Sequence, residues 1–107
     1  MQASTEITHY KLDADKNVIP CSLEEWGTMF EDFKKRIVGR TQLNNGVLVS
    51  SVFLGLNHNY SDANNPHVFE TMVFGGPNDG DCERCSTWQQ ALEIHERIVA
   101  REEGEKE

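Results

Sequence analysis

Apolar residues recur at two different periods along the chain, and the change of period separates helices from strands. Spacings of three and four residues predict amphipathic helices over residues 22–37 and 86–103. Two-residue alternation predicts strands near residues 10–12, 47–56 and 67–76, and a further strand before Asn45 completes a hairpin with 47–56. Short polar loops join these segments, so neighbouring strands are expected to run antiparallel.

The first predicted helix has a clear start and an aromatic stripe. Ser22 is a favourable N-cap, and Glu25 completes a capping box. The stripe that follows consists of Trp26, Met29, Phe30, Phe33 and Ile37. We expect this stripe to pack in the core, with Phe30 as a large buried side chain.

A hairpin and a long apolar strand follow. Asn45-Gly46 predicts a tight primed turn, which needs positive φ at both central positions. The strand over residues 47–56 is apolar on both faces, with one face formed by Val47, Val49 and Phe53 and the other by Leu48, Val52, Leu54 and Leu56. It is therefore expected at the centre of the sheet, covered on both sides or covered partly by a partner chain. Because only two helices are available as cover, a homodimer is favoured over a monomer.

The next strand and the second helix have one unusual residue each. Phe69, Thr71 and Val73 are expected on one face of the strand, and Glu70 on the other, with Val68, Met72 and Phe74. Ser86 or Thr87 is expected to cap the helix, whose apolar stripe is Trp88, Ala91, Leu92, His95, Ile98 and Val99. The carboxylate and the imidazole are thus both expected at largely apolar positions.

These elements predict an α+β fold, a mostly antiparallel sheet of about four strands with two packed amphipathic helices. The length of 107 residues fits a single domain spanning 1–107. We expect an ordered core from about residue 7 to residue 100 and a frayed tail over 101–107.

Composition and charge exclude several classes of partner. The net charge of −8 argues against nucleic acid, whose phosphates require clustered Lys and Arg. The chain has no apolar run long enough to cross a membrane and no signal-peptide pattern at its start. Three cysteines without such a signal favour reduced thiols in a cytoplasm.

Cys82 and Cys85 form a C-x-x-C motif between a strand and a helix. Such a pair can serve redox chemistry, or zinc binding if Cys21 and a histidine complete the set. The expected helix cap follows both cysteines, however, and the order of elements is not that of a thioredoxin fold. We therefore favour two ordinary reduced cysteines and expect no cofactor.

Glu70 needs a partner if its strand face is buried, because an isolated buried carboxylate is costly. The candidates are His95, the arginines Arg36, Arg40 and Arg84, and backbone donors. We expect His95 first, with its pKa raised by the neighbouring charge. His58, Glu70 and His95 are also the candidates for a metal site or for general acid–base catalysis. Otherwise His95 is a hydrogen-bonded core residue.

Three phrases, "VSSVFLGLNHNY", "FETMVFGG" and "ERCSTWQQALEIH", resemble a family of short uncharacterised bacteriophage and prophage proteins. Its members read approximately VSTVFLGLDHN, FETMVFGG and ERYSTWEEA, and the resemblance extends from about Tyr10 to His95. It implies a viral origin and action in the cytoplasm of an infected or lysogenic bacterium, but no reaction. The chain departs from the pattern at Asn57, where the family has Asp, and at Cys85, where it has Tyr.

Three classes of function remain. The first is non-catalytic binding of a host protein, as a small phage accessory protein for host takeover or evasion of defence. The second is binding of a small signalling ligand such as a nucleotide, through the loop over residues 57–65 and Arg84. Its ligand groups are Asn57, His58, Glu70, Arg84 and His95. The third, an alternative to binding, is a small metal- or His/Glu-dependent hydrolase.

Overall fold

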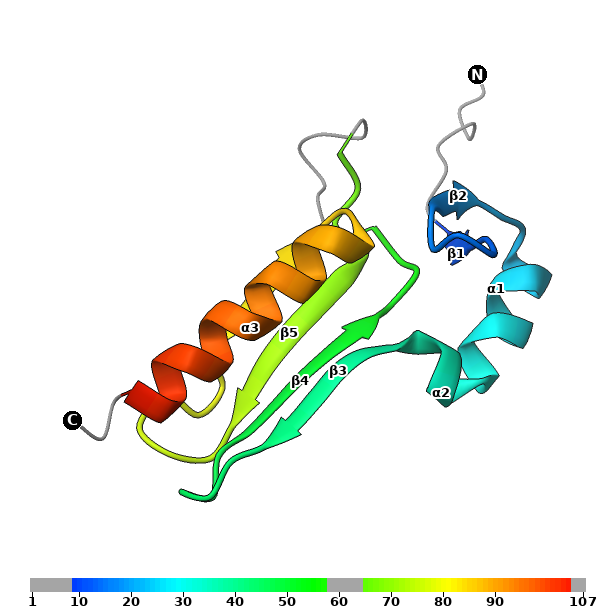
Figure 1. Cartoon of the computed structure of the whole chain (residues 1–107). Coiled ribbons are helices and arrows are strands. Elements are labelled where there is room, and N and C mark those ends of the chain that lie inside the picture. The colour runs from blue at the N-terminus through cyan, green and yellow to red at the C-terminus, as the bar shows by residue number, and fades with distance from the viewer. Residues whose placement is uncertain (1–8, 58–64, 105–107) are drawn as a thin grey trace.

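Two antiparallel sheets and three helices make up the computed structural model, which describes residues 9–57 and 65–104 (Figure 1). In chain order the elements are β1 (Tyr10–Leu12), β2 (Val18–Pro20), α1 (Leu23–Glu31), α2 (Phe33–Arg36), β3 (Ile37–Gln42), β4 (Leu48–Phe53), β5 (Phe69–Phe74), β6 (Cys82–Cys85) and α3 (Trp88–Gly104). The predicted α+β class is confirmed.

The larger sheet has the order β3-β4-β5-β6, so β4 is one of its two interior strands. The hairpin between β3 and β4 forms where it was predicted, but with a different turn. Leu43 and Val47 are paired, and of Asn45 and Gly46 only the glycine has positive φ (91°). The connection is therefore a three-residue loop with glycine at its left-handed position, and the predicted two-residue primed turn is wrong.

The fourth strand of this sheet is β6, which the sequence pattern did not predict as a strand. Its four residues have no apolar alternation, but they pair with β5, Glu70 opposite Arg84 and Met72 opposite Cys82. The predicted N-terminal strand instead pairs with β2 in a separate two-stranded sheet.

α3 covers one face of the large sheet, as Figure 1 shows. Val49, Phe53, Phe69 and Val73 point toward it and are buried, which confirms the predicted strand faces. The helix is capped by Thr87, whose hydroxyl accepts a hydrogen bond from the Gln90 backbone at 3.0 Å.

α3 also continues to Gly104, past the expected end of the core at residue 100. Glu102 holds this last turn in place. Its carboxylate is buried, and it accepts hydrogen bonds from Asn78 (2.8 Å) and Arg101 (2.9 Å).

The expected burial of Phe30 and Phe33 in the core is wrong, although Met29 of the first helix packs against the core and the capping box is confirmed. Ser22 and Glu25 exchange hydrogen bonds of 3.1 and 3.0 Å. The helix ends at Glu31, since Asp32 has non-helical angles and divides the predicted stripe between α1 and α2. No residue of α1 is fully buried, and Phe30 and Phe33 are 37% and 49% exposed.

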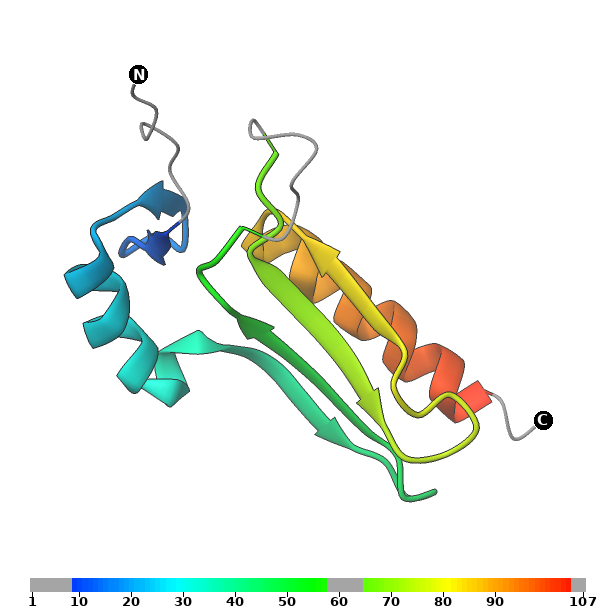
Figure 2. The same cartoon turned by 180° about the vertical axis from the view of Figure 1, so that it is seen from behind.

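The N-terminal elements β1, β2 and α1 form an arm attached at the end of β4. The Trp26 indole donates to the Leu54 carbonyl at 3.1 Å, and the Tyr10 amide donates to the Gly55 carbonyl at 2.8 Å. Gly55 has φ of 75°, and a Cβ there would lie 2.7 Å from the Trp26 ring. The arm lies beyond the sheet end in both views, which gives the elongated shape of 56 × 28 × 20 Å (Figure 2).

Candidate functional site

The face of the large sheet opposite α3 has no helix on it among the described residues, as Figure 2 shows. We call it the open face. Its central residues are Leu48, Ser50 and Val52 on β4 and Glu70, Met72 and Phe74 on β5. A solvated strand face normally carries polar residues, yet four of these six are apolar and Phe74 is 45% exposed. The open face therefore has the composition of a contact surface.

Charged groups flank this apolar centre. Arg40 on β3 is exposed and has no carboxylate partner among the described residues. On the other side the Glu70 carboxylate accepts hydrogen bonds from Arg84 (3.2 Å) and from the Cys82 thiol (3.3 Å). Because the Glu70 charge is paired, the open face carries one uncompensated positive charge in a protein of net charge −8.

The expected pair of Glu70 with His95 is wrong, because the two side chains lie on opposite faces of the sheet. Glu70 is on the open face, whereas His95 is on the α3 side, next to Thr71 and its row of strand neighbours. Arg84, one of the alternative partners considered above, is the partner, and its Nη2 lies 3.0 Å from the carboxylate. Successive strand residues alternate faces, so a contact from Glu70 to α3 would require passing through the sheet.

His95 lies over a row of small residues that crosses three strands. Gly39, Ser51 and Thr71 are side by side in register on β3, β4 and β5. The imidazole Nδ1 is 2.8 Å from the Ser51 hydroxyl, and Nε2 is 2.9 Å from the Thr41 hydroxyl. Ser51 in turn is 2.6 Å from the Thr71 hydroxyl.

The burial of this ring favours its neutral form. Burial lowers the pKa of His95, and the nearby charge of Glu96 offsets the effect only in part. The expected rise of the pKa is therefore wrong, since no carboxylate contacts the ring in the described structure. Ser51 is fully buried and His95 is buried, and both ring nitrogens form hydrogen bonds that link α3 to the sheet.

The proposed His58–Glu70–His95 cluster is not assembled by the described residues. His58 lies outside them, and Glu70 and His95 are on opposite faces. Within residues 9–57 and 65–104, no group of three or more His, Cys, Asp or Glu side chains could hold a metal ion. Asn57 is described, and its side-chain oxygen accepts from the His67 amide at 3.1 Å.

The two cysteines of the C-x-x-C motif do not form a pair. They are three positions apart on β6, and so Cys82 is exposed on the open face while Cys85 is buried in the core. Burial raises the pKa of both thiols, and hydrogen bonding to Glu70 raises that of Cys82 further. Reactive cysteines have lowered pKa values, so this arrangement gives no support to redox chemistry.

Arg84 also lines a shallow hollow at the start of α3. The hollow has a volume of about 290 Å³, and its other polar residues include Asn65, His67, Ser86 and Gln90. Asn65, the last residue of the loop in the small-ligand hypothesis, thus lines the same hollow as Arg84, whereas residues 58–64 of that loop lie outside the described residues. The Ser86 hydroxyl already donates to Asn65 at 2.6 Å, and Gln90 accepts from the Ser86 amide at 3.0 Å.

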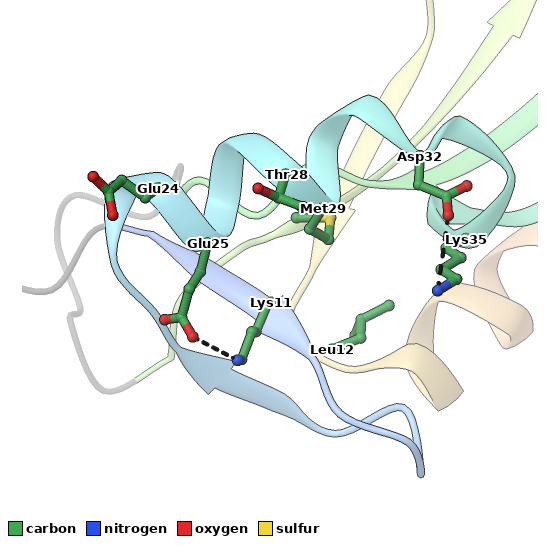
Figure 3. Close-up of a pocket in the computed structure, with 8 residues that line it drawn as sticks. All are labelled: Lys11, Leu12, Glu24, Glu25, Thr28, Met29, Asp32 and Lys35. Atoms are coloured by element: carbon green, nitrogen blue, oxygen red, sulfur yellow. Dashed lines mark hydrogen bonds and ion pairs between the residues drawn. The ribbon is translucent and has the colours of Figure 1, made fainter.

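A larger groove of about 500 Å³ lies in the arm, between β1 and the helices α1 and α2 (Figure 3). Leu12 and Met29 supply its apolar lining. Its lysines are paired, with Lys11 2.9 Å from Glu25 and Lys35 3.8 Å from Asp32. Of the expected ligand groups that the structure describes, Asn57, Glu70, Arg84 and His95, none lines this groove.

Comparisons with models of protein families, with curated proteins and with solved structures found no match to this chain. Among the described helices, none combines the length and the apolarity needed to cross a bilayer. The candidate site is thus defined by the geometry alone, and its strongest feature is the open face.

Proposed function

We propose that this chain is a non-catalytic binding protein that docks another protein through the open face of its sheet. The observation that carries the proposal is the apolar centre formed by the half-buried Leu48, Val52 and Met72 and the exposed Phe74. Burying apolar surface is the main favourable term in protein association. A rim of Arg40 on one side and the Glu70–Arg84 pair on the other supplies the polar border typical of an interface.

The charge distribution supports a partner with a carboxylate at the edge of its contact surface. Arg40 has no acidic partner among the described residues, and its guanidinium can bind a carboxylate through two hydrogen bonds. The partner we propose therefore presents apolar side chains flanked by Asp or Glu.

The resemblance to bacteriophage and prophage proteins gives this proposal a setting. A small phage accessory protein would act on a host protein in the cytoplasm of an infected or lysogenic bacterium, to take over the host or evade its defence. The absence of an assembled acid–base or metal cluster among the described residues makes binding the better-supported alternative to hydrolysis.

Affinity capture from a bacterial lysate, with a substitution on the open face, tests the proposal. Met72→Lys places a charge at the apolar centre, and we expect it to abolish capture of any specific partner. Leu23→Lys is the matched control, because Leu23 is 63% exposed on α1, away from the open face. If Met72→Lys and Leu23→Lys capture the same proteins as the unmodified chain, the open face is not the binding surface.

A small-ligand function is the second candidate, favoured by the hollow that joins Asn65, His67 and Arg84. A nucleotide phosphate is the ligand chemistry that suits an arginine in such a place. A thermal-shift screen with nucleotides tests it, and Arg84→Gln should remove any stabilisation. Absence of a shift with every nucleotide would exclude this candidate.

A further inference from the structure

The pairing register of the sheet places the residues of the open face in three parallel rows. The middle row is Arg40, Ser50, Met72 and Cys82, running across β3, β4, β5 and β6. One row beside it holds Gln42, Leu48 and Phe74, and the row on its other side holds Val52, Glu70 and Arg84. The line midway between β4 and β5 divides each row into two parts. Small and large side chains, and positive and negative ones, are distributed unequally between the two parts.

We propose that this face self-associates, so that its occupant is a second copy of this chain in a twofold sheet-on-sheet dimer. The inference rests on the proposed function of the open face as a protein-binding surface, and it names the partner. The twofold axis we propose runs parallel to the strands, above the line midway between β4 and β5. Rotation about this axis places each row of one copy over the same row of the other copy, in reverse order. Two sheets packed in this way have nearly aligned strands, which is a common arrangement.

In two of its three rows this axis makes the face complementary to itself, whereas the third row places Val52 over Glu70. Ser50 of one copy is placed over Met72 of the other, so a small side chain receives a large one. Leu48 is placed over Phe74, which joins the two most exposed apolar positions of the next row. Such alternation of small and large residues allows two surfaces to interdigitate.

The axis also brings charged groups of the two copies together. Arg40 on the outer strand β3 is placed over Cys82 of the second copy, one row from Arg84 on the same strand, and one row and one strand from Glu70. The Arg40 side chain can reach that carboxylate, which is already held in position by Arg84. A twofold axis perpendicular to the strands would instead stack β3 on β3 and bring the two Arg40 charges together, so it is disfavoured.

The area of the face predicts a weak dimer. Four strands of up to six residues span roughly 400 Å² on each copy. Because protruding side chains enlarge the accessible surface, the two copies together would bury about 1,000 Å² of accessible surface, near the lower limit of specific interfaces. We therefore expect reversible association in the micromolar range, in which self-association competes with any other partner of the same face.

Sedimentation velocity from low micromolar to near-millimolar concentration tests the proposal. We expect the unmodified chain to pass from monomer to dimer, Leu23→Lys to do the same, and Met72→Lys to remain monomeric. Arg40→Glu should weaken the dimer at least severalfold, because it places two carboxylates together, and its exposed position leaves folding intact. A monomer at every concentration, or a dimer that survives both Met72→Lys and Arg40→Glu, overturns the proposal.

The same variants separate this inference from the proposed function. If the unmodified chain stays monomeric but Met72→Lys loses a captured partner, the open face binds proteins but not itself. If dimerisation requires Met72 and partner capture does not, self-association stands and the proposed function of this face fails.

Discussion

Ser51 and His95 meet through a hydrogen bond of 2.8 Å between a strand hydroxyl and a helix imidazole, in the layer between the sheet and α3. The Thr41 hydroxyl is hydrogen-bonded to the other ring nitrogen, and the Thr71 hydroxyl is hydrogen-bonded to the Ser51 hydroxyl. Among the described residues, no buried side-chain nitrogen or oxygen is without a hydrogen-bond partner. Buried polar groups are tolerated in a core when they are hydrogen-bonded. The cluster can therefore orient α3 without the loss of stability that an unpaired buried polar group would cause.

The neutral state of His95 predicts a loss of stability in mild acid. Burial lowers the pKa of His95 in the folded state, whereas the unfolded chain has a pKa of about 6.5. The unfolded state therefore binds more protons, and the free energy of unfolding falls as pH drops from about 6.5 toward the folded pKa. An NMR titration should give His95 a pKa below 6.5, and a value at or above 6.5 would contradict the burial of a neutral ring.

Gly39 is expected to be intolerant of a methyl group. A Cβ at this position would lie 3.0 Å from the imidazole of His95, which its two ring bonds keep in place. Gly39→Ala should lower the free energy of unfolding by about 1–3 kcal/mol through overpacking. Gly27→Ala is the control, because no atom lies within 4 Å of its Cβ and alanine favours the helix. Urea melts of both variants check the expectation, and equal stability of the two would refute it.

The buried carboxylate of Glu102 should stabilise the end of α3. Burial favours its protonated form, but hydrogen bonds from Asn78 and Arg101 outweigh this and lower the pKa of Glu102. Glu102→Gln should therefore destabilise the fold by about 1–3 kcal/mol at neutral pH. This difference should disappear as pH falls through the lowered pKa, since the contribution of an ionised carboxylate is then lost.

Glu103→Gln is the matched control for Glu102, because the neighbouring residue is exposed. Thermal melts at several pH values should show little change for Glu103→Gln. A Glu102→Gln variant as stable as this control would mean that the last turn of α3 does not depend on the carboxylate.

The two phenylalanines Phe53 and Phe30 should differ in their contribution to stability. Phe53 is fully buried and contacts Phe69 at a ring-centroid distance of 5.0 Å, so Phe53→Ala should cost about 3–5 kcal/mol. Phe30 is half-exposed between Trp26 and Arg36, and Phe30→Ala should cost only about 1–2 kcal/mol. Equal losses in urea melts would place α1 in the core after all.

The local features of the fold could be predicted from the sequence, because they depend on neighbouring residues. The Ser22–Glu25 capping box, the alternating faces of β5 and the apolar stripe of α3 are examples. The pairing of β6 could not be predicted, because it depends on how residues 75–81 turn back along β5. Likewise, only the backbone angles of Asp32 separate α1 from α2 and divide the predicted aromatic stripe between them.

Some features of the candidate site could likewise be predicted from the sequence, and others could not. The second apolar face of β4 was evident from Leu48 and Val52, and among the described residues α3 covers only the opposite face. The partner of Glu70 was misjudged, because sequence proximity to α3 does not show which face of the sheet a strand residue occupies. The hydroxyl cluster was missed, although Ser51 and Thr71 at core-facing positions beside a helix histidine were its signal.

The measurement that tests the open face most directly is the methyl NMR signal of Met72. The protein contains three methionines, of which Met72 lies on the open face and Met29 lies in the arm. With methyl-labelled methionine, we predict that the Met72 signal shifts with protein concentration while that of Met29 stays constant. A Met72 signal unchanged from micromolar to millimolar concentration, and unchanged on addition of any captured partner, would contradict the account.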